Sequence, residues 1–134
     1  MNIDQKKITE IILKYHPKCQ AIYLFGSFAF GLENKDSDVD IAILLSYQEA
    51  KEIPTFLMSD LYNELANYLN RDIDLINLRT ASNVLQNQVV SKGSCIFYAD
   101  KYSKDEFEML SLSFYQKLNE ERREILEDIL GNKL

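Results

Sequence analysis

The sequence predicts one α/β domain (α+β-like) in which a small mixed sheet of about four strands is flanked by helices. Two observations favour this class. Segments with a helical repeat of apolar residues alternate with short apolar runs of strand length, in the order helix, strand, strand, helix, strand, helix, strand, helix. With two Pro and four Gly among 134 residues, the chain offers no linker that would divide it. We therefore expect a single domain over residues 1–134 with a modest core.

The first half of the chain is expected to form a helix, two strands and a second helix. A helix over residues 3–15 has one apolar face, and Pro17 ends it. Strands follow over residues 20–25 and 39–45, and the second is too apolar to have a fully solvated face. A helix over residues 54–69 begins with a proline in its first turn. Its apolar face comprises Leu57, Leu61, Leu65, Tyr68 and Leu69.

The second half begins with a strand over residues 72–78, in which polar and apolar side chains alternate. A short helix over residues 82–91 follows, with Ser82 as its N-cap and Gly93 as its stop. A fourth strand covers residues 94–99.

A long helix over about residues 103–130 ends the chain, and Ser103 followed by Glu106 predicts a capping box at its start. Its apolar positions are Phe107, Leu110, Phe114, Leu118, Ile125 and Ile129. Tyr115, Arg122 and Arg123 lie off this apolar face, and such residues are common at the centres of protein interfaces. The helix therefore either contacts a partner or only packs on the sheet.

The composition restricts the possible partners. A formal net charge of −6 and a pI of about 4.8 do not suit binding to nucleic acid backbones, which needs clustered Lys and Arg. Cys19 and Cys95 lack metal-site or redox spacing, so both are expected as small core residues of a reduced, intracellular protein. The first residues lack the apolar segment of a signal peptide, so we expect none, and no apolar run is long enough to span a bilayer. We expect a cytoplasmic protein that binds neither nucleic acid nor membranes.

Aspartates with a spacing of two residues occur on two of the predicted strands. Asp38 and Asp40 share one face of their strand, where two negative charges are unfavourable unless a cation lies between them. Asp72 and Asp74 repeat the spacing on the third strand, and either can complete a cluster if the two strands are neighbours. Carboxylate ligands of this kind select hard cations such as Mg²⁺.

A small-residue turn, Gly26-Ser27, follows the first strand directly. Glycine lets backbone N–H groups approach an anion closely, and Ser27 adds a hydroxyl group. A helical turn that began there would point its positive end toward a phosphate. A phosphate site beside a carboxylate metal site is suited to phosphoryl or nucleotidyl transfer.

Other motifs share parts of this stretch. Residues 26–33 have the glycine spacing of a Walker A loop, but Leu32 stands where that loop needs Lys. The acidic residues within 36–40 match the start of an EF-hand loop, but Ile41 stands where that loop needs Gly. A lone pair of aspartates would be most simply a surface turn. The preceding Gly-Ser turn and the apolar strand that follows favour a functional site instead.

Taken together, Gly26-Ser27, Gly31 and Ser37-Asp38-Val39-Asp40 resemble the nucleotidyltransferase signature of the DNA polymerase beta superfamily. More narrowly, they resemble its minimal nucleotidyltransferase (MNT) branch, over about residues 20–100. The resemblance implies the polymerase-beta-type fold and a nucleotidyltransferase activity.

The resemblance also implies three acidic metal ligands. The first two correspond to Asp38 and Asp40. Asp74 is chosen as the third because residues 74–78 match the family pattern Asp-Leu-Val-x-Leu, and Asp72 remains the alternative. Two Mg²⁺ ions and ATP would then be required, with the β- and γ-phosphates bound by the Gly26-Ser27 turn.

Many MNT proteins of this size are antitoxins paired with a HEPN-domain ribonuclease toxin, and MntA-type antitoxins transfer AMP from ATP to a tyrosine hydroxyl of that toxin. The resemblance therefore implies a protein adenylyltransferase with a HEPN toxin as its partner. Two alternatives stay open: an antitoxin that neutralises its toxin by binding alone, and transfer of a nucleotide to a small hydroxylated molecule such as an aminoglycoside.

Overall fold

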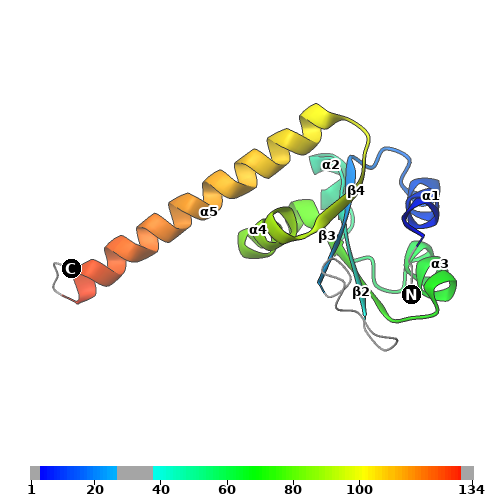
Figure 1. Cartoon of the computed structure of the whole chain (residues 1–134), viewed down its shortest axis with the longest axis horizontal. Helices are drawn as coiled ribbons and strands as arrows, with labels where there is room; N and C mark the ends of the chain where they lie inside the picture. The colour runs from blue at the N-terminus through cyan, green and yellow to red at the C-terminus, as the bar shows by residue number, and fades with distance from the viewer. Residues whose placement is uncertain (1–3, 27–37, 131–134) are drawn as a thin grey trace.

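The computed structural model describes residues 4–26 and 38–130. In this part of the chain a four-stranded sheet in the order β3-β2-β1-β4 separates two groups of helices (Figure 1). The strands are β1 (Ala21–Phe25), β2 (Val39–Leu44), β3 (Ile73–Asn77) and β4 (Ser94–Tyr98). β1 is antiparallel to β2 and β4, whereas β2 and β3 are parallel. The predicted mixed sheet of four strands is confirmed.

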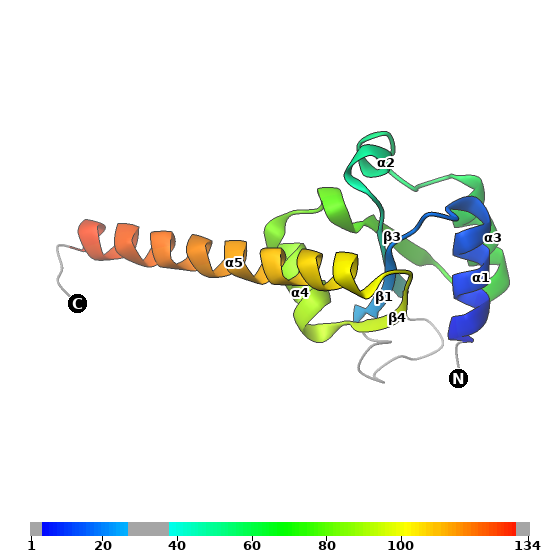
Figure 2. The same ribbon diagram turned by 90° about the horizontal axis from the view of Figure 1, so that it is seen from above.

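The helices form on both faces of this sheet. They are α1 (Gln5–Tyr15), α2 (Tyr47–Lys51), α3 (Asp60–Leu69), α4 (Asn83–Lys92) and α5 (Lys101–Ile129), with a 3-10 turn, η2 (Leu78–Thr80), after β3. α1 and α3 cover one face, and α4 and the start of α5 cover the other (Figure 2). Among the described residues, no helix combines the length and the apolar character needed to cross a membrane.

The core on the α1 and α3 side is built from Ile and Leu. α1 begins where the Asp4 side chain accepts a hydrogen bond from the Lys7 backbone N–H, and its apolar face is fully buried. Its contacts with the sheet and α3 form a cluster of buried side chains that includes Ile8, Ile12, Cys19, Ile22, Leu24, Val39, Ile41, Ile43, Leu61, Leu65, Ile73 and Leu75. Cys19 is therefore a core residue, as predicted.

The core on the α4 and α5 side is smaller. It comprises Ala21, Tyr23, Ala42, Leu44, Leu78, Val89 and Phe107. The Tyr23 hydroxyl group donates a hydrogen bond of 2.7 Å to Glu108 Oε2, which attaches the first turns of α5 to the sheet. Burial and the Glu108 carboxylate raise the pKa of Tyr23 well above its ordinary value, so its hydroxyl group stays a donor.

Arg79, in η2, connects the sheet with α2 and α5. Its Nε donates to the Leu45 carbonyl oxygen and its Nη2 to Gln20 Oε1, each at 2.6 Å. The guanidinium group also lies 4.3 Å from the centroid of the Tyr47 ring and 5.3 Å from that of Phe107. One cation therefore holds three separate elements together beside the end of β2.

The prediction of a helix over residues 54–69 is wrong in its first part. α3 begins at Asp60, because the Ser59 side chain caps it and Met58 has a left-handed backbone with φ of 65°. Leu57, predicted on the buried face, consequently lies outside the helix and is 62% exposed. The short α2 is not predicted at all.

The long C-terminal helix is confirmed, with a different cap. α5 begins at Lys101, and the Asp100 side chain accepts hydrogen bonds from the backbone N–H groups of Tyr102 and Ser103. Asp100 therefore caps the helix in place of the predicted capping box. Figure 1 shows α5 extending far beyond α4 and the sheet. Of its predicted apolar positions only Phe107 is buried.

Candidate active site

The carboxylates predicted to act together meet where β2 and β3 begin and β1 ends. The parallel register places Asp40 beside Asp74, and the antiparallel register places Phe25 on the other side of Asp40. Residues paired across neighbouring strands project from the same face of a sheet, so Asp40 and Asp74 lie side by side. Ala42, two residues along β2, packs in the core on the α4 side, which identifies the face that carries both carboxylates.

Asp38 immediately precedes β2 and is exposed, whereas Asp40 is half-buried. Burial raises the pKa of Asp40, and the negative charges of Asp74 and Asp38 raise it further. The structure thus brings Asp38 and Asp74 within electrostatic reach of Asp40. Asp72 is not among the charges that act on Asp40, and its carbonyl oxygen accepts a hydrogen bond from the Val39 N–H at 3.1 Å. This geometry favours Asp74 over Asp72 as the third carboxylate.

Gly26 lies directly against this cluster. Its φ is +74°, and a Cβ atom added to it would lie 2.1 Å from Asp40 Oδ2 and 3.1 Å from Asp40 Cγ. Only a glycine allows the Asp40 carboxylate its observed position beside the turn. Ser27, Gly31 and Ser37 fall outside the described residues, so the phosphate-binding role of the Gly26-Ser27 turn remains a prediction.

The donor set suits Mg²⁺, which binds oxygen ligands only. Within the described residues, however, no three Asp, Glu, His or Cys side chains are arranged to hold a metal ion by themselves. The aspartates form an open set on one sheet face. Mg²⁺ usually takes one or two protein carboxylates and completes its shell with water and substrate phosphates. The arrangement therefore fits an ion that binds together with a nucleotide.

A hollow of about 170 Å³ adjoins Asp74 at the outer edge of β3. It is lined by Thr55, Leu57, Tyr62, Ile73, Asp74 and Leu75, and we call it the β3 hollow. The sequence does not indicate this hollow, because its apolar pattern predicts that residues 54–59 belong to the helix over residues 54–69. The serine N-cap at Ser59 was the one available signal that the helix begins later.

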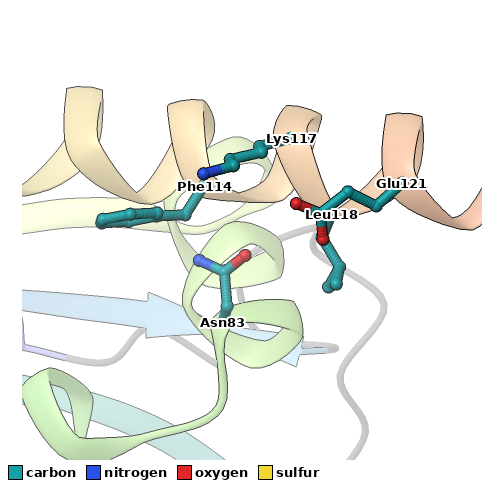
Figure 3. Close-up of a pocket in the computed structure, with 5 residues that line it drawn as sticks. All are labelled: Asn83, Phe114, Lys117, Leu118 and Glu121. Atoms are coloured by element: carbon teal, nitrogen blue, oxygen red, sulfur yellow. The ribbon is translucent and has the colours of Figure 1, made fainter.

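A larger hollow of about 380 Å³ lies between the start of α4 and the middle of α5. Figure 3 shows the Asn83 side chain pointing from α4 toward α5, where Phe114, Lys117, Leu118 and Glu121 complete the lining. None of the predicted site residues lines this hollow. It is separate from the carboxylates.

Comparisons with known proteins match this chain to nucleotidyltransferases over most of its length. A family model described as "Polymerase beta, Nucleotidyltransferase" matches residues 6–102. The protein adenylyltransferase MntA of Shewanella oneidensis is 35% identical over 130 residues, which span 97% of this chain and 90% of that protein. A solved structure of a toxin-antitoxin with AMP-PNP contains a chain with a TM-score of 0.80 and 34% identity, covering 96% of this chain and all of that one.

A second solved structure contains a tri-AMPylated HEPN toxin of Shewanella oneidensis in complex with an MNT antitoxin. The matching chain has a TM-score of 0.68 and 33% identity, over 95% of this chain and 96% of that one. Alignments of this extent include most of α5, so the long helix is part of the shared fold.

Proposed function

This chain belongs to the polymerase beta nucleotidyltransferase family, and from this premise we propose that it is a Mg²⁺-dependent protein adenylyltransferase of the cytoplasm. It transfers AMP from ATP to a hydroxyl group, that of a tyrosine, on a cognate HEPN-type toxin and so acts as its antitoxin. One observation carries the proposal: the parallel register places Asp74 beside Asp40, and the charge of Asp38 also acts on Asp40. The relatives named above supply the acceptor class.

Asp38 and Asp40 would hold one Mg²⁺ on the triphosphate, and together with Asp74 they would hold a second near the acceptor. Ions bound there would neutralise phosphate charge and favour ionisation of the attacking hydroxyl group. Burial and, after it, repulsion from Asp74 and Asp38 raise the pKa of Asp40, and bound cations would offset that repulsion.

The acceptor oxygen attacks the α-phosphorus of ATP, and the bond from that phosphorus to the oxygen bridging the β-phosphate breaks. Pyrophosphate leaves and the hydroxyl proton passes to the carboxylate cluster. The backbone of the turn at Gly26 would bind the β- and γ-phosphates, which orients the leaving group away from the acceptor.

Incubation with labelled ATP, Mg²⁺ and a HEPN-type toxin as the acceptor tests the proposal. Label should enter the partner and be lost with Asp38→Asn or Asp40→Asn, because each removes a metal-binding charge. Asp72→Asn is the matched control, since this exposed aspartate is two residues from Asp74 and should leave labelling unchanged. Labelling that survives both active-site changes would refute the assignment of the site.

The same variants separate catalysis from neutralisation by binding. If the doubly substituted Asp38→Asn, Asp40→Asn protein protects cells as well as the wild type does, binding is sufficient. Transfer to an aminoglycoside in the absence of any protein acceptor would instead favour a small-molecule substrate.

A further inference from the structure

β3 is an edge strand, and no other strand of the described residues pairs with its outer side beside Asp74. The Val39 N–H donates to the Asp72 carbonyl oxygen at 3.1 Å, and in a parallel ladder alternate residues bond to one neighbour. The backbone groups of Asp74 therefore face β2, whereas those of Ile73 and Leu75 point outward. Among the described residues, none forms a backbone hydrogen bond with these outward groups.

The far end of β3 is held by the end of α2. The Asn77 side-chain amide donates to the carbonyl oxygens of Ala50, in α2, and of Ile53, just after it, each at 3.0 Å, which fastens this segment to that end of the strand. The open part of the edge is thereby confined to the beginning of β3, next to the carboxylates.

The β3 hollow lies along this open part. Leu57, which forms one wall, is 62% exposed, so an apolar side chain faces solvent at the rim of the site. Tyr62 belongs to α3, which packs on the face of the sheet opposite the carboxylates. The hollow therefore reaches around the edge from Asp74 to the α3 side, and its volume of about 170 Å³ suits one side chain.

We propose that the segment of the partner protein that carries the acceptor hydroxyl group binds as an added strand along the open edge of β3, with an adjacent side chain in the β3 hollow. This inference rests on the proposed function and names where its protein substrate binds. Strand addition satisfies the outward N–H and C=O groups of Ile73 and Leu75. Successive residues of a strand face opposite sides, so the residue beside Asp74 presents its hydroxyl group to the carboxylates.

The same alternation places the neighbouring residue of the segment on the α3 side, between Leu57 and Tyr62. An apolar side chain is expected there, because Leu57 is an exposed apolar residue of the lining and Ile73 and Leu75 add apolar surface. The three aspartates repel acidic residues, so the segment itself is neutral or basic. A partner that bound only elsewhere on this chain would leave the edge of β3 unpaired and the β3 hollow empty.

Leu57→Glu tests the hollow, and Met58→Glu is its matched control. Met58 is the next residue, is 82% exposed and does not line the hollow. Both changes are made at exposed positions, and equal melting temperatures would verify that both variants fold. With the HEPN-type protein as acceptor, Leu57→Glu should raise the KM for that protein about tenfold, as expected for loss of an anchoring contact. The KM for ATP should not change, and Met58→Glu should behave as the wild type.

Hydrogen exchange of single backbone amides tests the edge. In the presence of Mg²⁺, the HEPN-type protein and an ATP analogue with a methylene group between its α- and β-phosphates, which blocks transfer, exchange should slow at Ile73 and Leu75. It should stay unchanged at Asp74, whose N–H already faces β2. Unchanged exchange at Ile73 and Leu75, or an unchanged KM in Leu57→Glu, would overturn strand addition while AMP transfer by the wild type stands. Failure of the wild type to transfer AMP would overturn the proposed function and this inference with it.

Discussion

Gly26→Ala is expected to damage the site and the fold through two separable effects. The backbone at this position has φ of +74°, and an L-residue in the left-handed region costs about 1–2 kcal/mol. The new Cβ atom would also lie 2.1 Å from Asp40 Oδ2 and 3.1 Å from Asp40 Cγ. Rotation of the carboxylate alone does not relieve both contacts, so the whole Asp40 side chain must move. A forced side-chain conformation adds about 1 kcal/mol.

A double-mutant cycle isolates the second effect. In an Asp40→Ala background the nearest remaining Asp40 atom is Cβ, at 3.5 Å, which is an ordinary contact. Gly26→Ala should therefore cost about 1 kcal/mol less in that background than in the wild type, measured by urea unfolding. In the transfer assay, Gly26→Ala should lower the rate by about 100-fold, because a displacement of about 1 Å in a catalytic group has this effect. An equal loss of stability in both backgrounds, or a wild-type transfer rate, would refute the reasoning.

Four further outcomes follow from the described contacts. Asp40→Asn should raise the free energy of unfolding at pH 7 without metal, because a carboxyl group whose pKa is raised by folding destabilises the folded protein when it is ionised. This gain in stability should vanish below the ordinary pKa of 3.8, and a gain that does not depend on pH would contradict the reasoning. Mg²⁺ with ATP should raise the Tm of the wild type and not that of Asp38→Asn, as read by thermal unfolding. Arg79→Ala should lower the free energy of unfolding by about 2–4 kcal/mol, since it leaves a buried carbonyl oxygen without its partner. Arg79→Lys should restore only part of the lost stability, and a loss below about 0.5 kcal/mol in Arg79→Ala would refute the role of the guanidinium group. A chain ending at Arg122 should unfold in urea within about 0.5 kcal/mol of the full chain, because the removed part of α5 is almost entirely exposed; a larger loss would show hidden contacts.

The fold follows from local patterns wherever an element is long enough to show one. Apolar patterns predict α1, α5 and all four strands, and the Ser82 and Gly93 signals predict α4, within a few residues of their observed bounds. α2 has five residues, of which only Ala50 is buried, so no periodic signal exists. The start of α3 depends on a left-handed turn at Met58, and a non-glycine residue does not predict this conformation.

The candidate site shows the same limit. Strand periodicity places Asp38 with Asp40, and Asp72 with Asp74, on one face each. It does not decide which strands are neighbours or which residues pair across them. The observed register, Asp40 beside Asp74, distinguishes Asp74 from Asp72, and this register results from packing of the whole sheet. The close approach of Gly26 to Asp40 likewise joins segments that are separate in sequence.

The outer half of α5 has a thermodynamic consequence for the free protein. From Arg122 to Leu130 every side chain except the half-buried Glu127 is exposed, so this stretch gains almost nothing from burial. A helix of so few turns is marginal in water, and the Arg123–Glu127 pair, at 3.9 Å, adds only a few tenths of a kcal/mol. Its order is governed by a local helix–coil equilibrium that fades gradually with heat, outside the cooperative transition of the sheet. Helical circular dichroism should consequently decline before the signal of the buried tyrosine, Tyr23, changes, and a single two-state fit would misstate the enthalpy of unfolding.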